Sequence, residues 1–324
     1  MKISVVIPTY NSAKFIAATI ESVFRQTVPP DEILVLDDGS KDDTVSILHS
    51  YGPRITVFQQ ANRGVAAARN ELCKRVSGDL IAFLDHDDIW HPSYLEVQSR
   101  QAEKHPTASA FYTLHLNFYG YDGHQWSDGA FNGNTEPQVI TPAGFVERYN
   151  NSTGTYYSMS FCCIPKWILA RLGNSPFYEA VSGVDDCYIS NLFPLLGPVV
   201  LTPAPLVAYR VTSQAQSSNQ LNNFKMVVQV FELLESRYRY SADGKLLRAF
   251  NLAFAGKRRR YGKTLMGEGR ISEARNHFLI AIKQSQNPVS MAKSMSLFCF
   301  SYMPSSLQPR WPSSSRTSAT RTAG

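Results

Sequence analysis

The sequence lacks any apolar run approaching the roughly 20 residues needed to cross a bilayer, so we expect no membrane-spanning helix. It also lacks the features of a signal peptide. Met1-Lys2 leads directly into the strand-like residues 3–7, without a basic region, a long apolar core or a small-residue cleavage site. Cysteine is scarce: the five cysteines include no C-x-x-C pair and no zinc-like spacing to histidines. We therefore expect reduced, mostly buried thiols in a cytoplasmic protein.

Charged residues are few and unevenly placed. They make up 18% of the chain against 44% hydrophobic residues, which is typical of a folded globular protein. Residues 1–224 hold 15 Lys/Arg against 21 Asp/Glu, net −6, whereas residues 225–324 hold 17 against 5, net +12. A basic C-terminal region is compatible with anionic lipid, nucleic acid or acidic glycans. Because aromatic residues are not interleaved with its basic residues, we expect no nucleic-acid partner.

The first 105 residues alternate short apolar runs with stretches of helical periodicity. The predicted strands are 3–7, 32–36, 55–58 and 80–84. This alternation predicts an α/β fold, with a mostly parallel sheet covered by helices on both faces. Polar breaks follow three of the strands, at 8–11, 37–40 and 85–88, and we expect them to converge in one crevice beyond the strands' carboxyl ends. The helix starts predicted from capping boxes are Ser40 with Asp43 and Ser93 with Glu96.

The second part of the chain follows a different pattern from residue 106 onward. The predicted strands are 111–121, 158–164, 199–201 and 207–210, and the predicted helices begin near 142 and span 165–172 and 185–195. Residues 122–137, rich in glycine, asparagine and aspartate, are predicted to form a surface loop.

The last hundred residues are basic and helical in pattern. A polar linker at 213–222 precedes a predicted helical extension at 220–303. Within the extension, residues 267–269 separate two helices that resemble a single tetratricopeptide-like hairpin. Residues 304–324 are rich in serine, threonine, arginine and proline and are predicted to be disordered.

Three carboxylates, Asp85, Asp87 and Asp88, end the apolar run that begins at Phe83. Such a cluster repels itself unless a metal ion or another positive group lies among its members. Asp85 and Asp87, two residues apart at a strand end, can point the same way, and His86 between them is expected to turn away and pack. Asp88 is expected to start a helix or to support its neighbours. The alternative is an acidic turn exposed to solvent.

Four segments, taken in this order and spacing, resemble family 2 of the glycosyltransferases. They are Ser4-Val5-Val6-Ile7-Pro8-Thr9-Tyr10-Asn11, Asp37-Asp38-Gly39-Ser40, Asn62-Arg63-Gly64 with Ala68-Arg69-Asn70, and Phe83-Leu84-Asp85-His86-Asp87-Asp88. The resemblance covers roughly residues 1–215 and implies the GT-A fold of nucleotide-diphospho-sugar transferases. It implies a nucleotide-sugar half at 1–105 and an acceptor half at 106–215.

The resemblance also implies roles for individual residues. Those assigned to nucleotide-sugar binding are Pro8, Thr9, Tyr10, Asp38, Arg69, Asp85 and Asp87. Asp87 and Asp85 would hold Mn²⁺ or Mg²⁺ against the donor diphosphate, with Asp87 coordinating and Asp85 nearer the ribose. Asp38 would contact uracil, and the residues around Tyr10 would line the base pocket. Asp37 has the alternative of capping its turn, and Arg69 that of a surface ion pair.

The acidic pair Asp185-Asp186 stands where the resembling family opens a helix with two acids. By that resemblance Asp186 is the general base that takes the proton from the acceptor hydroxyl, and Asp185 orients it. A single base opposite the leaving group implies inversion at the anomeric carbon. The alternative is that both acids only favour the helix dipole. Many relatives carry a histidine at the position of Thr212, so no contact to the metal or the diphosphate is assigned to that segment.

The expected activity is an inverting, metal-dependent transfer of a sugar from a nucleotide-diphospho-sugar, favouring uridine, to a glycan or lipid-linked acceptor in cell-surface polysaccharide biosynthesis. The basic extension is expected to approach an anionic membrane surface from the cytoplasmic side. One alternative is a catalytically idle relative that acts as a binding or scaffold module. A sugar-1-phosphate nucleotidyltransferase would need a glycine-rich, arginine-containing loop after the first strand, and dinucleotide binding would need G-x-G-x-x-G there. A metal-dependent phosphatase would need a nucleophilic aspartate at that strand, and residues 8–11 supply none of these features.

Overall fold

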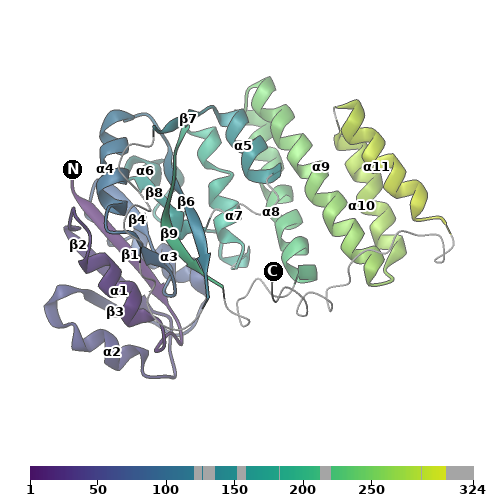
Figure 1. Cartoon of the computed structure of the whole chain (residues 1–324). Coiled ribbons are helices and arrows are strands. Elements are labelled where there is room, and N and C mark those ends of the chain that lie inside the picture. The colour runs from purple at the N-terminus through teal and green to yellow at the C-terminus, as the bar shows by residue number, and fades with distance from the viewer. Residues whose placement is uncertain are drawn as a thin grey trace. The chain divides into compact units, whose positions relative to one another are not determined.

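A computed structural model of the chain describes residues 1–119, 126, 136–151, 158–181, 183–211, 220–285 and 287–303 (Figure 1). The chain divides into two compact units. The first consists of Met1–Pro142 with Tyr156–Ala215, and the second of Ala143–Thr155 with Gln216–Gly324. We refer to them as the sheet unit and the helical unit.

The sheet unit is built on one mixed sheet, which has nine strands among the residues described. These are β1 (Ile3–Thr9), β2 (Glu32–Asp37), β3 (Thr56–Gln59), β4 (Leu80–Phe83), β5 (Ile89–Trp90), β6 (Ala110–Phe118), β7 (Gln138–Ile140), β8 (Cys162–Pro165) and β9 (Val199–Arg210). Their order is β3-β2-β1-β4-β8-β6-β9-β5, with β7 also paired to β9. Strands β1 to β4 are mutually parallel, and β8 runs antiparallel to its neighbours. The expected α/β fold with a mostly parallel sheet is confirmed.

Helices flank this sheet (Figure 1). They are α1 (Ile16–Phe24), α2 (Thr44–Ser50), α3 (Val65–Cys73), α4 (Tyr94–Lys104), α6 (Trp167–Leu172) and α7 (Asp185–Ser190). Every residue of β1 is buried, as its almost continuously apolar sequence requires of a strand covered on both faces. Strands β1, β2 and β4 therefore form a rigid base, and their carboxyl ends carry the polar loops predicted from the sequence.

Strand β9 corrects one prediction. Two strands were expected at 199–201 and 207–210, but Val199–Arg210 is a single strand that continues through Pro203 and Pro205. It pairs with β6 in parallel, and the register shifts where Thr113 faces Thr202 and Leu114 faces Pro205. These irregularities leave residues 203, 204 and 206 without a partner in β6, so Pro203 lies outside the ladder and Pro205 lies between two register shifts, where a missing N–H is tolerated. On its other edge β9 pairs first with β7 and then with β5.

Both predicted capping boxes are wrong. Helix α2 begins at Thr44 without a side-chain cap, and Ser40 Oγ instead accepts the N–H of Asn11 at 2.8 Å. Helix α4 follows Ser93, whose side chain does not cap it. Its expected partner Glu96 accepts from Thr27 Oγ1 at 2.8 Å. In both cases a side chain expected to cap a helix instead forms a hydrogen bond to a residue distant in the sequence.

The helices of the helical unit are α5 (Pro142–Asn151), whose first residue belongs to the sheet unit, α8 (Gln220–Ser241), α9 (Gly244–Gly267), α10 (Ile271–Gln284) and α11 (Pro288–Phe300). Aromatic rings join α8 to α9: the Phe250 ring stacks on Tyr238 at 3.9 Å and on Phe231 at 5.1 Å between centroids. The predicted turn between α9 and α10 is present, with Gly269 at a φ of 76°. Within the described part of the chain, no helix combines the length and apolar character needed to span a membrane. The predicted linker, surface loop and tail lie largely or wholly outside the described residues.

Candidate functional site

The loops that follow β1 and β2 are tied together at the carboxyl edge of the sheet. The Asp38 N–H donates to the Thr9 carbonyl at 2.8 Å. Asn11, at a φ of 47°, accepts the N–H of Lys41 on its Oδ1 at 2.8 Å. The adjacent strand β4 ends at the same edge, where the Leu84 N–H donates to the Val6 carbonyl at 3.0 Å. The first three polar breaks therefore lie together, as the parallel strands require.

Asp38, expected to contact uracil, is buried and organises the loop before α3. Its Oδ1 accepts from Gln60 Nε2 at 2.7 Å and from the Arg63 N–H at 2.9 Å, and its Oδ2 accepts from the Gly64 N–H at 2.7 Å. These bonds from the described residues use three of the carboxylate's roughly four acceptor positions. Asp37 caps its turn by accepting the Ser40 N–H at 3.1 Å, which was its alternative reading.

The remaining residues of the expected base pocket differ in exposure. Pro8 and Thr9 are buried in β1, and the Thr9 hydroxyl is hydrogen-bonded to Ser12. Tyr10, the next residue, is 42% exposed. Of these three, Tyr10 is therefore the residue whose side chain is free to stack on a base.

Arg69 joins two segments that are far apart in the sequence. Its side chain is only 6% exposed; Nη1 lies 2.6 Å from Asp185 Oδ2, and Nη2 pairs with Asp85 Oδ1. Both carboxylates belong to the predicted site, one at the end of β4 and one at the start of α7. The alternative of a surface ion pair is wrong, because the pair is buried. We call Asp85, Arg69 and Asp185 the arginine clamp.

Asp85 remains ionised within the clamp. Burial alone would raise its pKa, but the Arg69 charge and the hydrogen bonds from Arg69 and Ser158 outweigh it and lower the pKa below its usual value. Ser158 Oγ donates to Asp85 Oδ2 at 3.0 Å, and the Asp85 N–H donates to Ser160 Oγ at 2.9 Å. Ser158 therefore holds the carboxylate oxygen that Arg69 does not contact, and Ser160 holds the backbone of the same residue.

Asp87 and Asp88 differ from Asp85 because no cation neutralises them to the same degree. Burial, together with the Asp85 carboxylate, raises the pKa of half-buried Asp87, although the charge of His86 opposes the rise. Burial and the charges of Asp87 and Asp85 raise the pKa of fully buried Asp88 well above its usual value. Asp88 Oδ1 accepts the Arg210 N–H at 3.0 Å. Asp88 therefore starts no helix; it ties the loop after β4 to the end of β9. His86, expected to turn away, is near enough for its charge to act on the two flanking carboxyl groups.

The donor set of this loop fits a divalent cation that arrives with a ligand. No group of three or more candidate ligand side chains is present in the ranges that the structure describes, so a metal held entirely by the protein is not indicated there. Mg²⁺ typically binds through one or two carboxylates, with phosphate oxygens and water completing its shell. The raised pKa of Asp87 marks a carboxylate short of positive charge, and its partial exposure leaves it accessible.

The acidic pair at the start of α7 separates into a buried and an accessible carboxylate. Asp185 is 1% exposed and accepts from Arg69 and from the Gly183 N–H at 3.1 Å. Asp186 is partly exposed and accepts the Cys187 N–H at 2.6 Å. Burial and the Asp185 charge raise the pKa of Asp186 to about 7, against the opposing effect of Arg69. A carboxyl group with a pKa near neutrality is suited to proton transfer.

Asn70 is a functional candidate that sequence reasoning left without a role. Its Nδ2 donates to the Phe177 carbonyl at 2.8 Å, and its Oδ1 accepts the Phe177 N–H at 2.9 Å. Arg63 pairs with Glu179 at 3.0 Å in the same region. Together with the arginine clamp, these contacts hold the segment leading into α7 against α3. The available signal was the position of Asn70 directly after Arg69 in a recognised motif. Thr212 lies outside the described residues.

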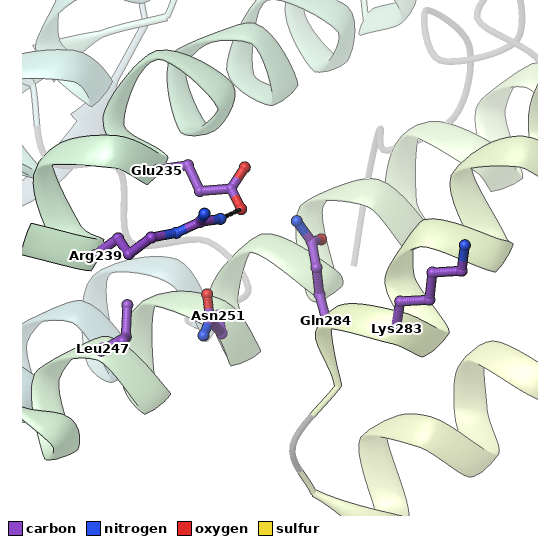
Figure 2. A pocket seen from close by; sticks show the side chains of 6 residues that line it. All are labelled: Glu235, Arg239, Leu247, Asn251, Lys283 and Gln284. Atoms are coloured by element: carbon purple, nitrogen blue, oxygen red, sulfur yellow. Dashed lines mark hydrogen bonds and ion pairs between the residues drawn. The ribbon is translucent and has the colours of Figure 1, made fainter.

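A pocket of about 200 Å³ lies in the helical unit (Figure 2). The residues that line it are Glu235, Arg239, Leu247, Asn251, Lys283 and Gln284. Arg239 pairs with Glu235 at 3.0 Å, as Figure 2 shows, and both side chains are substantially exposed. None of the predicted site residues contributes to this pocket, which is a polar surface hollow.

Comparison with known proteins connects this arrangement to one family. Residues 4–163 match the family profile described as Glycosyl transferase family 2. An uncharacterized glycosyltransferase of Rickettsia conorii is 39% identical over 142 residues, which cover 43% of this chain and 24% of the relative. The Escherichia coli UDP-Glc:alpha-D-GlcNAc-diphosphoundecaprenol beta-1,3-glucosyltransferase WfgD is 43% identical over 98 residues, covering 30% of this chain and 39% of the relative. The match therefore spans well under half the length of both relatives.

Solved structures share the architecture over most of the chain. S. aureus TarS 1-349 has a TM-score of 0.67 at 19% identity, covering 93% of this chain and 90% of that one. The same protein in complex with UDP-GlcNAc gives a TM-score of 0.66 at 17% identity over the same shares. At this identity the likeness shows the fold alone, and that fold is GT-A.

Proposed function

Because the chain belongs to family 2 of the glycosyltransferases, we propose that it transfers a sugar from a nucleotide-diphospho-sugar to a hydroxyl group of a glycan or lipid-linked acceptor. UDP is the nucleotide that we assign to the donor. A relative is named for a UDP-sugar and a diphosphoundecaprenol acceptor, and a protein of the same fold binds UDP-GlcNAc. Another relative, the Escherichia coli chondroitin synthase, is 34% identical over 118 residues and is named for polysaccharide synthesis.

The arginine clamp is the observation that carries this proposal. Donor binding and proton transfer require carboxylates from different parts of the chain to meet in one site. Arg69 contacts Asp85, next to the candidate metal ligand Asp87, and also Asp185, next to the candidate base Asp186. The clamp therefore brings the donor side and the base side of the proposed reaction within the reach of one guanidinium.

In the proposed reaction, Asp186 accepts the proton of the acceptor hydroxyl as that oxygen attacks the anomeric carbon. The new bond joins the acceptor oxygen to the anomeric carbon, the bond from this carbon to the phosphate oxygen breaks, and the nucleoside diphosphate leaves with the electron pair. Attack from the face opposite the leaving group inverts the anomeric centre. A Mn²⁺ or Mg²⁺ ion bound by Asp87 and Asp85 would neutralise the charge on the leaving diphosphate. Asp185, held by Arg69, positions Asp186.

The two halves of the sheet unit receive different roles in this proposal. We assign the donor to residues 1–105, where Tyr10 stacks on the base and Asp38 accepts the uracil N–H. The acceptor is assigned to residues 106–215. A lipid-linked acceptor would place the protein at the cytoplasmic face of a membrane.

The test is a screen of nucleotide sugars by thermal shift, followed by donor hydrolysis and transfer with and without Mn²⁺. We expect UDP-sugars to stabilise the protein in the presence of Mn²⁺ and a chelator to remove both the stabilisation and the turnover. Asp87→Asn should weaken Mn²⁺-dependent UDP binding at least about tenfold. Asp43→Asn is the matched control, since Asp43 is an exposed acid before α2.

Two results would contradict the proposal. Unchanged sugar transfer by Asp87→Asn would remove the metal assignment. Donor binding without hydrolysis or transfer to any acceptor would favour the alternative of a catalytically idle binding module.

A further inference from the structure

Helix α7, which carries the candidate base Asp186, has little stability of its own. It contains only six residues, Asp185–Ser190, and isolated helices shorter than about 12 residues are marginal in water. The residue before it is Val184, whose apolar side chain cannot cap a helix. Contacts with the rest of the sheet unit must therefore determine where α7 and its carboxylates lie.

One of these contacts begins at Asn70 in α3. Asn70 is 2% exposed, and both ends of its side-chain amide bind the backbone of a single residue, Phe177. Nδ2 donates to the Phe177 carbonyl at 2.8 Å, and Oδ1 accepts the Phe177 N–H at 2.9 Å. A side-chain amide offers the same donor and acceptor as a peptide group, so this pairing satisfies both backbone groups of Phe177. Two bonds to one residue fix its orientation as well as its distance.

The ring of Phe177 is held as firmly as its backbone. Phe177 is 2% exposed, and its ring lies edge-on to that of Phe83, with 5.6 Å between the centroids. The guanidinium carbon of Arg69 lies 5.6 Å from the centroid of the same ring. Phe83 is the last residue of β4, just before the loop that carries Asp85. Phe177 therefore rests against the strand end that leads to the candidate donor-side carboxylates.

Short-range hydrogen bonds lead from Phe177 towards α7. The Tyr178 carbonyl accepts the Val181 N–H at 3.1 Å, and the Val181 carbonyl accepts the Val184 N–H at 3.0 Å. A segment folded into successive turns cannot lengthen without breaking these bonds. A shift of Phe177 is therefore transmitted to the start of α7.

We propose that Asn70 is a positioning residue for the transfer reaction: by fixing Phe177, it holds Asp186 at the place where this carboxylate meets the acceptor hydroxyl. Asn70 and the arginine clamp have different tasks in this arrangement. Arg69 holds Asp185 at the start of α7, and a guanidinium–carboxylate contact fixes a point but not a direction. Asn70 holds the same segment at an earlier point, and two fixed points define its direction.

This inference rests on the proposed function, because Asp186 is a base only if the chain transfers a sugar. The alternative is that Asn70 only stabilises the fold, as buried hydrogen-bonded amides do. A stabilising role predicts less folded protein with unchanged turnover per folded molecule. A positioning role predicts lower kcat in protein that is still folded. Turnover per folded molecule therefore separates the two roles.

The first experiment compares Asn70→Leu with a matched control, Gln98→Leu. Gln98 is also a buried amide of the sheet unit, and its Nε2 donates from α4 to the Phe111 carbonyl of β6 at 3.0 Å. We expect Asn70→Leu to lower kcat about tenfold to a hundredfold with the donor KM within about twofold, because a small misplacement of a reacting group has an effect of this size. Gln98→Leu should also lower the free energy of unfolding but leave kcat unchanged. Equal kcat values for the two folded variants would overturn the proposal.

The pH profile of kcat is a second readout that a purely stabilising role would not move. Burial and the Asp185 charge raise the pKa of Asp186 to about 7. When Asn70→Leu loosens the segment, water reaches this carboxyl group, and the rising limb of the profile should move to lower pH by about one unit. Gln98→Leu should keep the midpoint of the parent. If neither variant moves the midpoint, Asp186 keeps its surroundings without Asn70 and the positioning role is wrong.

Amide hydrogen exchange tests the hold of Asn70 on this segment without any sugar transfer. Asn70→Leu should speed the exchange of Phe177 and residues 183–190 at least about tenfold, whereas Gln98→Leu should not. This result in a chain that transfers no sugar would remove the proposed function and keep the hold of Asn70 on the segment. Unchanged exchange in an active chain would remove only the positioning role.

Asn70→Asp keeps the proposal testable should Asn70→Leu fail to fold. It retains an oxygen that accepts the Phe177 N–H, but only a protonated carboxyl group can donate to the Phe177 carbonyl. A carboxylate there would also face Glu179, whose Oε1 lies 3.3 Å from Asn70 Nδ2. Because the folded state favours the protonated form, the stability of this variant should approach that of the parent as the pH falls from about 8 to about 5. A stability deficit that stays constant over this range would mean that the paired contact with Phe177 is not formed, and the proposal would be overturned.

Discussion

Arg69 Nη1 lies 2.6 Å from Asp185 Oδ2, although 116 positions separate these two residues in the chain. The contact is buried, and the same guanidinium also holds Asp85. One side chain therefore connects the end of β4 with the start of α7, and its removal affects both.

Arg69→Met should strongly destabilise the sheet unit. It leaves the buried Asp185 carboxylate and the partly exposed Asp85 carboxylate without their cation, and removing one partner of a buried ion pair costs about 3–5 kcal/mol. The control is Arg100→Met. Arg100 pairs with Glu96 at the same 2.6 Å, but both side chains are exposed. Its loss should cost less than about 1 kcal/mol. Urea unfolding of both variants measures the loss of unfolding free energy. Similar losses for Arg69→Met and Arg100→Met would show that burial of the arginine clamp does not affect its contribution to stability.

Asp186 should impose a pH dependence on turnover. The pKa of its carboxyl group is raised to about 7 by burial and by Asp185, so the group is largely protonated in mildly acidic solution. A general base must be deprotonated, and we therefore expect turnover to rise with pH through about 7. Asp186→Asn should lower turnover about 10²- to 10⁴-fold while donor affinity is retained. A flat pH profile between 5 and 8 would place the base elsewhere.

The carboxyl group of Asp186 should also make the free energy of unfolding depend on pH, and the raised pKa fixes the direction of this dependence. Because the folded pKa of Asp186 is higher than the unfolded value, the folded state binds more protons between about pH 4 and 7. This group's contribution to folding stability is therefore fully present below pH 4 and is lost as the pH rises through 7. Asp186→Asn removes the ionisation, so the variant should be more stable than the parent at pH 8 and similar at pH 4. Denaturant midpoints at the two pH values measure this difference.

Gly39→Ala should damage the loop that Asp38 organises. Gly39 has a φ of +79°, and a Cβ there would lie 2.9 Å from the backbone N of Asn62. Gly52 provides a control, because its φ of +58° is also positive but a Cβ would meet nothing within 4 Å. Gly52→Ala should cost only the conformational strain, about 1–2 kcal/mol. Gly39→Ala should cost more and should also weaken UDP binding, as calorimetric titration would detect. If Gly39→Ala and Gly52→Ala lower stability equally, the short distance between residue 39 and the backbone of Asn62 does not constrain the loop.

Gly262→Ala should destabilise the helical unit. A Cβ at Gly262 would lie 2.5 Å from Phe278 Cε1, so α9 and α10 would have to separate at an overpacking cost of about 1–3 kcal/mol. Gly256→Ala, in the same helix, meets only the Arg259 side chain at 3.7 Å. This control should be neutral or stabilising by about 0.5–1 kcal/mol, because alanine favours a helix. Thermal unfolding followed by circular dichroism distinguishes the two.

The first half of the sheet unit was predictable because local sequence determines it. Strands β1, β2 and β4 are short apolar runs buried on both faces, and their parallel order places the polar breaks after them at one edge. The loop after β4 shows the limit of this reasoning. Asp85 and Asp88 are three residues apart in the sequence, yet one is paired with Arg69 and the other with the Arg210 N–H. Their partners come from distant segments, so the local pattern could not separate their roles.

The errors follow from the same cause. Pro203 and Pro205 break the strand pattern locally, but the bulge against β6 accommodates them. Ser40 has the spacing of a helix cap, but Asn11 from the preceding loop donates to its hydroxyl. In both cases a contact with a residue distant in sequence overrides the local structural preference on which the prediction was based.

The long strand β9 also determines when the site can form. It pairs with β6 in parallel, joining Ala110 to Val199 and Phe118 to Arg210. Contacts of such sequence separation form late, because a long loop must close before they stabilise the chain. Asp88 is anchored by the last residue of β9. During synthesis, the early strands can therefore assemble as soon as they leave the ribosome, but the carboxylate loop gains its final support only after Arg210 has emerged.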